Sequence, residues 1–262
     1  MVTAQLVKEL RDRTGISMMD CKSALVEADG DIDKAIEVLR KKSIIKAEKK
    51  SSRETNEGVI VLGKTNDGDF IIEVNTETDF AAKDADFQVF LSDLSAFCSD
   101  KNPKDLNELE GLYKDQLLEI IQKIGENIKI SYFEKISSDG AFIYSYLHTD
   151  KKLAALVKLD KDQPELGRDI AMQVSANSPL AISAEDIDQD ILDKEKEIAI
   201  ATLEGENKPD DIKEKIVMGK LNKFKQENSL VEQPFIKDPD QKIKDILNGA
   251  TILAFARKKV GQ

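Results

Sequence analysis

The sequence is poor in the residue types that build metal centres, disulfide frameworks and catalytic triads. Its 262 residues include two cysteines, Cys21 and Cys98, one histidine, His148, and no tryptophan. Two cysteines cannot form a disulfide framework or a four-ligand zinc site, and a single histidine weakens any metal or triad assignment. We therefore expect neither a bound metal nor another cofactor in this chain.

A basic excess and long apolar runs are also absent. The 39 lysines and arginines are outnumbered by 50 aspartates and glutamates, which leaves a net charge of -11. Because phosphate contacts dominate nucleic-acid affinity, we expect no direct binding of DNA or RNA. No apolar run approaches the roughly 20 residues that a membrane helix needs, and no signal peptide is recognised. We expect a cytoplasmic protein without membrane contact whose partner is another protein.

Catalytic machinery is not evident either. We predict no phosphate-binding glycine-rich loop, and a Gly-x-Ser-x-Gly nucleophile motif that could serve His148 is absent. One enzymatic alternative remains, in which the carboxylates of Glu73, Glu77 and Asp79 bind Mg²⁺ where a strand runs out into a loop. Three nearby carboxylates are ordinary in a chain with 50 acids, so this is the weaker hypothesis.

The order of the predicted elements indicates an α+β protein with several parts. Helical spacing of apolar residues dominates near the N-terminus and again at residues 184–229, whereas strand patterns dominate the middle. We expect a three-helix domain at 1–42, a linker at 43–56, an N-terminal core subdomain at 57–140, the first part of a C-terminal core subdomain at 141–183, a helical hairpin at 184–229, and the final part of that C-terminal subdomain at 230–262.

The first 50 residues predict three short helices. Gly15 and Gly30 are typical helix stops, and Ser17 and Asp31 are typical caps of the helices that follow. So small a module buries little core and is suited to presenting a contact surface. We expect the inner face of the second helix to consist of Met19, Ala24 and Leu25.

The middle of the chain mixes strand and helix patterns. Asp67-Gly68 separates the apolar runs 59–62 and 70–74, which is a strong hairpin signal. Further strands are predicted at 128–136, 142–147 and 153–159, and helices at 87–97, 109–124 and 164–176. A short helix at 243–247 and a strand at 251–260 complete the prediction.

Residues 184–229 predict an antiparallel helical hairpin with a turn at 205–209. A projecting two-helix arm usually packs against another protein surface, so we expect self-association or a partner contact through it. One predicted apolar stripe comprises Ile187, Ile191, Ile198 and Ala201, and the other comprises Ile212, Ile216, Leu221 and Phe224.

The segment 75–83 has two interpretations. It places Phe80 directly after Asp79 in a polar loop between a strand and a helix. In the first interpretation, Thr78 or Asp79 caps the next helix and Phe80 packs into the core as a hydrophobic staple. In the second, Phe80 protrudes as an apolar wedge beside a charge, as aromatic anchors do at interface hot spots.

Several motifs together resemble the elongation factor Ts family, in the correct order over nearly the whole chain. The two most specific are the run Thr14-Gly15-Ile16-Ser17-Met18-Met19-Asp20-Cys21-Lys22 and the segment Glu73-Val74-Asn75 … Glu77-Thr78-Asp79-Phe80 … Ala82-Lys83-Asp84. Later blocks are Gly125-Glu126-Asn127-Ile128, Ile216-Val217 … Gly219-Lys220-Leu221 … Phe224, and Gln233-Pro234-Phe235.

The resemblance implies a fold and a function. The implied fold has a UBA-like three-helix domain, a two-subdomain α+β core with antiparallel strands, and a protruding coiled-coil-like hairpin. The implied function is guanine-nucleotide exchange on elongation factor Tu, the GTPase that delivers aminoacyl-tRNA to the ribosome, without covalent chemistry by the factor itself. A homodimer or a heterotetramer with Tu, formed through the core or the hairpin, is compatible with this reading.

The resemblance also implies roles for individual residues. Thr78, Asp79, Phe80 and Ala81 match the loop that displaces Mg²⁺ from Tu, while Arg11, Met18, Met19 and His148 match contacts with Tu. For the methionines, the alternative is that one of the two packs in the three-helix core. For the whole chain, a further alternative is a passive helical interaction module that has no effect on nucleotide exchange.

The chain departs from the family pattern in two places. The family histidine is usually followed in the pattern His-x-x-Gly-Lys-x-Gly, whereas here Lys151 and Ala154 replace both glycines. Without these glycines, we expect that a turn that needs a positive φ is not kept, which puts the role of His148 in doubt. Longer members carry a further C-terminal helix that contacts Tu, so we expect lower affinity or redistributed contacts here.

Overall fold

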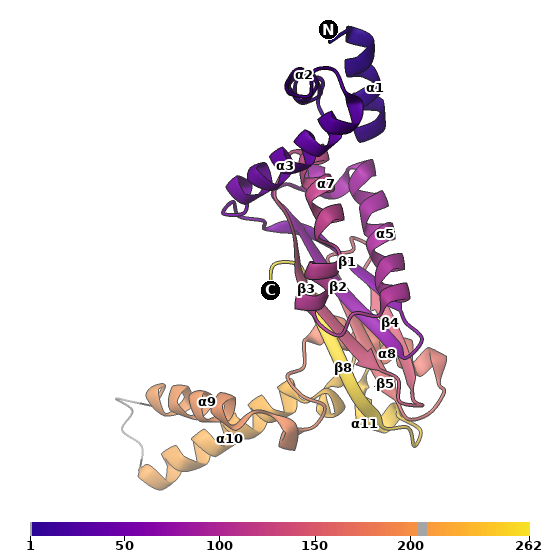
Figure 1. The fold of residues 1–262 in the computed structure, drawn as a ribbon. Coiled ribbons are helices and arrows are strands. Elements are labelled where there is room, and N and C mark those ends of the chain that lie inside the picture. The colour runs from indigo at the N-terminus through magenta and orange to yellow at the C-terminus, as the bar shows by residue number, and fades with distance from the viewer. Residues whose placement is uncertain (1, 204–208) are drawn as a thin grey trace. The chain divides into compact units, whose positions relative to one another are not determined.

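The computed structural model describes residues 2–203 and 209–262 and has an α+β fold. Figure 1 labels its helices and strands in chain order. The chain divides into two compact units. The first unit contains the residues up to Lys135 together with 148–153 and 258–262, and the second contains 136–147 and 154–257. Within the described ranges, no helix combines the length and the apolar character needed to cross a bilayer.

A three-helix module begins the first unit. Its helices are α1 (Ala4–Thr14), α2 (Met18–Glu27) and α3 (Ile32–Lys50). The predicted stop at Gly15 is confirmed by its φ of 67°, and the Ser17 hydroxyl caps α2 by accepting a bond from the Asp20 amide at 3.2 Å. Helix α3 continues to Lys50, into the predicted linker. The module has a core of its own, made of Val7, Leu10, Ile16, Cys21, Ala24, Leu25, Ala28, Ala35 and Leu39.

The first three-stranded sheet has the order β1 (Glu57–Lys64), β2 (Gly68–Thr76), β3 (Ile128–Ser137). Strands β1 and β2 pair antiparallel from Glu57 opposite Thr76 to Lys64 opposite Asp69, which confirms the predicted hairpin. Every residue of the central strand β2 is buried. Helices α5 (Ala85–Lys101), α6 (Leu106–Leu112) and α7 (Lys114–Ile124) contribute to the same hydrophobic cluster as this sheet.

The helix predicted at 109–124 is wrong as a single element. Tyr113 interrupts it with φ -108° and ψ 12°, so that α6 ends at Leu112 and α7 begins at Lys114. The Tyr113 ring is buried, and its centroid lies 5.6 Å from that of Phe90 and 4.8 Å from that of Phe97. Packing of this ring against α5 therefore accompanies the break, which helical periodicity alone did not reveal.

The second sheet has the order β4 (Phe142–Leu147), β5 (Leu153–Leu159), β8 (Ile252–Lys259). Strands β4 and β5 pair antiparallel, and helix α8 (Pro164–Asn177) contacts β4. The short pair β6 (Pro234–Phe235) and β7 (Asp238–Lys242), which the sequence did not predict, precedes α11 (Ile243–Ile246). The buried core of these elements consists of Ala155, Val157, Leu159, Ile170, Ala171, Val174, Leu230, Phe235, Ile243 and Ile252.

The helical hairpin consists of α9 (Gln189–Ala201) and α10 (Asp210–Asn228), which lie side by side (Figure 1). The stripe predicted for α9 is wrong, because Ile191, Ile198 and Ala201 are exposed, whereas Leu192 and Ala199 are buried. The stripe predicted for α10 is wrong at Ile212, which is exposed. Residues one apart on a helix differ by about 100° in direction, so adjacent apolar pairs left the choice of face open. Of the predicted turn, residues 205–208 lie outside the described residues, and Pro209 occupies the N-cap of α10.

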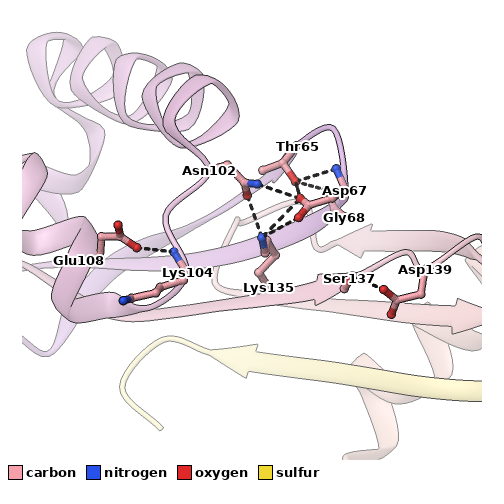
Figure 2. A network of polar contacts seen from close by, with 9 residues as sticks. All are labelled: Thr65, Asp67, Gly68, Asn102, Lys104, Glu108, Lys135, Ser137 and Asp139. Carbon is pink, nitrogen blue, oxygen red and sulfur yellow. Dashed lines mark hydrogen bonds and ion pairs between the residues drawn. The ribbon is translucent and has the colours of Figure 1, made fainter.

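A polar network ties the β1–β2 turn to α5 and β3 (Figure 2). Asp67 accepts hydrogen bonds from the Thr65 hydroxyl at 2.7 Å, from Asn102 Nδ2 at 3.1 Å, and from Lys135 Nζ at 3.2 Å. Lys135 also donates to Asn102 Oδ1 at 2.8 Å. These contacts, the Thr65 hydroxyl first, lower the pKa of Asp67 from its usual 3.8 to about 2.

Replacing Asp67 by asparagine should make stability less dependent on pH in acid. Because the folded pKa lies below the unfolded value, the carboxylate stabilises the fold above about pH 4 and loses this effect as pH falls through about 2. Urea unfolding of the native chain and Asp67→Asn should therefore differ most near neutral pH and converge in acid. Asp100→Asn, at an aspartate paired with its neighbour Lys101, is the control. A native-to-variant difference that stays constant with pH would contradict the assignment.

Candidate functional site

A short helix, α4 (Asp79–Lys83), follows the buried strand β2 and forms the candidate site. Thr78 is its N-cap in extended conformation, and the Thr78 hydroxyl oxygen accepts a bond from the Ala81 amide at 3.2 Å. Asp84 ends α4 and at once caps α5, where its carboxylate accepts a bond from the Asp86 amide at 2.8 Å. Two consecutive caps thus hold a five-residue helix between a strand and a long helix.

Phe80 points away from the protein core. Its side chain is 81 % exposed, whereas the following residues Ala81 and Ala82 are buried. The cap predicted in the first interpretation is present at Thr78, but the accompanying staple is wrong, because Phe80 does not pack inward. An isolated aromatic ring held in water on a capped turn is the arrangement that an interface anchor needs.

Asp79 places a negative charge beside this ring. Lys83, one turn further along α4, approaches its carboxylate at 2.7 Å. The Lys83 ammonium holds the pKa of Asp79 below its usual value, and the more distant charge of Lys152 acts in the same direction. Asp79 therefore carries its charge at neutral pH. Because an exposed ion pair contributes little to stability, a partner can exchange it at little cost.

Two glutamates tie the segment that leads into α4 to neighbouring parts of the chain. Glu126 accepts hydrogen bonds from the Thr78 amide at 3.0 Å and from the Thr78 hydroxyl at 2.7 Å. Glu77 accepts a bond from the Asn127 amide at 2.6 Å and pairs with Arg53 at 3.2 Å. Glu126 was not predicted as a site residue, although it lies in the motif Gly125-Glu126-Asn127, which was a signal for it.

The carboxylates of the enzymatic alternative do not gather into one site. Glu73 forms an ion pair with Lys258 at 3.0 Å, while Glu77 and Asp79 bind Arg53 and Lys83 as described above. Among the described residues, no group of three or more histidine, cysteine or acidic side chains is arranged to hold a metal ion. The three carboxylates are therefore occupied by different cations, which leaves the Mg²⁺-enzyme hypothesis without a ligand set.

Residues 58–65 match the spacing Gly-x-x-x-x-Gly-Lys-Thr of a phosphate-binding loop, which the prediction of no such loop overlooked. These residues form strand β1, which pairs with β2, and not a loop that opens a helix. The glycines have packing reasons: a Cβ at Gly58 would lie 2.4 Å from the Val74 carbonyl oxygen, and one at Gly63 would lie 2.1 Å from the Phe70 ring. The structure therefore excludes a phosphate loop here.

His148 begins a tight turn between β4 and β5. Its amide donates to the Leu153 carbonyl at 2.8 Å, its carbonyl accepts from the Lys151 amide at 2.9 Å, and its side chain is exposed. Lys151, at the first family glycine position, has φ 56°, so the turn with a positive φ is kept without glycine, and the expectation that it is lost is wrong. Ala154, at the second, is a buried β5 residue outside the positive-φ region.

The turn at 148–153 is linked to α4 through Gln88 on α5. Gln88 Nε2 donates to the Ala82 carbonyl at 2.8 Å, and Gln88 Oε1 accepts from Lys151 Nζ at 3.2 Å. The Lys151 carbonyl in turn accepts from the Ile60 amide at 2.7 Å. The structure thus brings the Phe80 segment and the His148 turn together, through a glutamine that no sequence motif singled out.

Lys151→Gly should stabilise the protein by roughly 0.5 kcal/mol. Holding a non-glycine residue in the left-handed region destabilises the folded chain by about 1 kcal/mol or more. Glycine removes this strain, but its greater freedom in the unfolded chain offsets roughly half of the gain. Ala154→Gly is the matched comparison, and it should destabilise by about 1 kcal/mol because that residue is extended and buried. Denaturant unfolding measures both variants, and effects of the same sign would contradict the φ argument.

Arg11, Met18 and Met19 lie on the three-helix module, which has a core separate from that beside α4. Arg11 is exposed on α1, and the Met18 and Met19 side chains are 44 % and 74 % exposed at the start of α2. The expectation that Met19 lines the inner face is wrong, and so is the alternative that one methionine packs in the core. Unbranched, polarizable side chains exposed on a helix start are suited to fitting an irregular partner surface.

Comparisons with known proteins identify one family over most of the chain. A family model described as "Elongation factor TS" matches residues 77–262. The protein named elongation factor Ts of Alkalilimnicola ehrlichii is 41 % identical over 271 residues, which cover 100 % of this chain and 92 % of the relative. Its counterpart in Marinobacter nauticus is 44 % identical over 266 residues, with 100 % and 91 % covered. The Clostridium kluyveri protein is 43 % identical over 256 residues, with 92 % and 84 % covered.

Proposed function

This chain belongs to the elongation factor Ts family, and from that premise we propose that it binds elongation factor Tu carrying GDP and promotes exchange of GDP for GTP by displacing Mg²⁺ from Tu. The observation that carries the proposal is the Phe80 ring, exposed on a doubly capped helix next to a charged aspartate. The protein is a translation factor that works in the cytoplasm and carries out no covalent chemistry of its own.

The proposed mechanism starts from what holds GDP in a GTPase. Backbone donors of the phosphate loop and Mg²⁺ neutralise the phosphate charge, and the metal is the largest local charge at the site. Phe80 inserts between elements of Tu that position the metal, and the Asp79 carboxylate disturbs the neighbouring hydrogen bonds and charge balance. Thr78 and Ala81 contribute the cap and the buried turn that present these two side chains. Without Mg²⁺ the nucleotide loses much of its electrostatic attraction, and GDP leaves faster.

The rest of the proposed contact surface lies on two other elements. Arg11, Met18 and Met19 present a charged and apolar surface on the three-helix module, and His148 presents an exposed imidazole on a turn linked to α4. In this proposal the module supplies affinity and the α4 segment supplies the exchange activity. The same proposal includes the predicted division of the chain. It has an N-terminal Tu-binding domain, two core subdomains, and a helical hairpin that serves association.

Thermodynamic linkage sets the direction of the cycle. If the factor weakens GDP binding to Tu by some ratio, nucleotide weakens factor binding by the same ratio. Incoming GTP therefore releases the factor, which can act again on another molecule of Tu. A factor that acts repeatedly needs to be present only in amounts well below those of Tu.

The decisive experiment measures release of fluorescent GDP from Tu. We expect the purified chain, added in substoichiometric amount, to accelerate release of the whole bound pool. Complex formation without any change in the release rate would instead identify a passive interaction module. Turnover of a substrate by this chain alone, abolished by Asp79→Ala, would instead support the enzymatic alternative.

A further inference from the structure

We propose that Glu126 is a positioning residue for the exchange reaction: its carboxylate, through Thr78, sets the direction in which α4 presents Phe80. This inference rests on the proposed function and assigns to it a residue that does not touch the partner. Glu126 follows Gly125, which ends α7 with φ 87°, and precedes strand β3. It reaches α4 from a segment distant in sequence.

The contact itself is two-pronged. One oxygen of Glu126 accepts the Thr78 amide at 3.0 Å and the other accepts the Thr78 hydroxyl at 2.7 Å. The same hydroxyl oxygen accepts the Ala81 amide at 3.2 Å, so the carboxylate, the hydroxyl and the first turn of α4 form one chain of hydrogen bonds. Bonds to a charged acceptor are the stronger kind, and two of them on one residue fix orientation as well as distance.

A reciprocal contact reinforces this one. Glu77, the residue before Thr78, accepts the amide of Asn127, the residue after Glu126, at 2.6 Å. The segment after β2 and the segment before β3 therefore each donate a backbone amide to a carboxylate of the other. Asn127 Nδ2 also donates to the Arg53 carbonyl at 2.9 Å, which adds the segment after α3 to the same cluster.

Helix α4 depends on such external support. A five-residue helix is far below the length at which an isolated helix is stable in water. Its longest apolar side chain, Phe80, faces solvent, and only the small side chains of Ala81 and Ala82 are buried. With so little buried apolar area, the direction of α4 depends on hydrogen bonds at both of its ends, and those at its start pass through Thr78. Weakening these hydrogen bonds would keep the Phe80 ring but would no longer fix the direction in which it points.

The test compares Glu126→Ala with the native chain in GDP release from Tu. The maximal release rate at saturating factor should fall about tenfold, while the factor concentration that gives half the maximal effect changes less than about twofold. Glu126→Gln keeps one acceptor oxygen and should lose less than Glu126→Ala. Glu232→Ala is the matched control, because Glu232 also binds two partners, Lys242 and Lys244, but in the second unit. This variant should accelerate GDP release from Tu as much as the native chain does.

Two further readings make the result specific. In a Phe80→Ala background, Glu126→Ala should cause no additional loss, because an effect exerted through Phe80 cannot act without it. Additive losses would overturn the inference. In the free chain, the Ala81 and Ala82 amides should exchange with solvent faster in Glu126→Ala than in the native protein. Unchanged amide hydrogen exchange would also overturn the inference, even if Glu126→Ala slows GDP release from Tu. If the native chain does not accelerate GDP release from Tu at all, the proposed function is refuted instead.

Discussion

Replacing Phe80 by alanine should lower the rate of GDP release from Tu about 30-fold at saturating factor. An aromatic anchor seated in a partner pocket contributes at least about 2 kcal/mol, which corresponds to a factor of about 30 in rate if that contact is made in the release step. The ring has few other roles, because it is 81 % exposed in the free chain. The measurement is stopped-flow release of fluorescent GDP.

The same variant should leave the fold intact. Truncating an exposed side chain opens no cavity, so the free energy of unfolding should change by no more than about 0.5 kcal/mol. Leu112→Ala is the matched control, since Leu112 is another large exposed apolar residue, on α6. If Phe80→Ala accelerates GDP release from Tu as much as the native chain does, the Phe80 wedge is not part of the mechanism. Equal slowing by Leu112→Ala would show that apolar surface in general, and not this ring, is responsible.

The direction of Phe80 illustrates a limit of sequence reasoning. A cap residue followed by an aromatic is compatible with both an inward staple and an outward anchor, because both use the same local pattern. The decision depends on whether the core has room, and here Ala81 and Ala82 occupy the buried side of α4. The cap itself was predictable from Thr78, since capping is a local effect of side chain on backbone.

Long-range partners were the part that the sequence could not supply. The hairpin of β1 and β2 and the bounds of β4 and β5 agree with the predictions, because turn chemistry and alternation act over a few residues. The contacts of Glu126 with Thr78 join positions 48 apart. No spacing rule links such positions in a single sequence.

The turn after His148 shows the opposite error, in which a rule was applied too strictly. A glycine is the usual residue at positive φ, yet Lys151 adopts it here. The amide of Val260 donates to the Lys152 carbonyl at 2.9 Å and the amide of Ile60 to the Lys151 carbonyl at 2.7 Å. Tertiary contacts on both sides of the turn hold a conformation that the residue alone disfavours.

Replacing Lys258 by methionine should destabilise the first unit by about 3 kcal/mol or more. Glu73 lies in the central strand β2 with 2 % of its surface exposed, and Lys258 Nζ approaches its carboxylate at 3.0 Å. Removing the lysine leaves a buried carboxylate without its counter-charge, which is the costly way to break such a pair. Methionine keeps most of the apolar stem, so packing loss is a minor part of the effect.

The remaining partners of Glu73 define the matched variant. Its Oε1 accepts hydrogen bonds from Asn75 Nδ2 and from the Gly261 amide, both at 2.8 Å, and a glutamine oxygen can accept these as well. The double variant Glu73→Gln with Lys258→Met should therefore recover more than half of the stability that Lys258→Met alone loses. Lys223→Met, which removes one partner of the exposed pair with Glu227, should change stability by less than about 0.5 kcal/mol. Guanidinium unfolding of the four proteins measures these differences, and a double variant no more stable than Lys258→Met would show that lost packing, and not the stranded charge, is the cause.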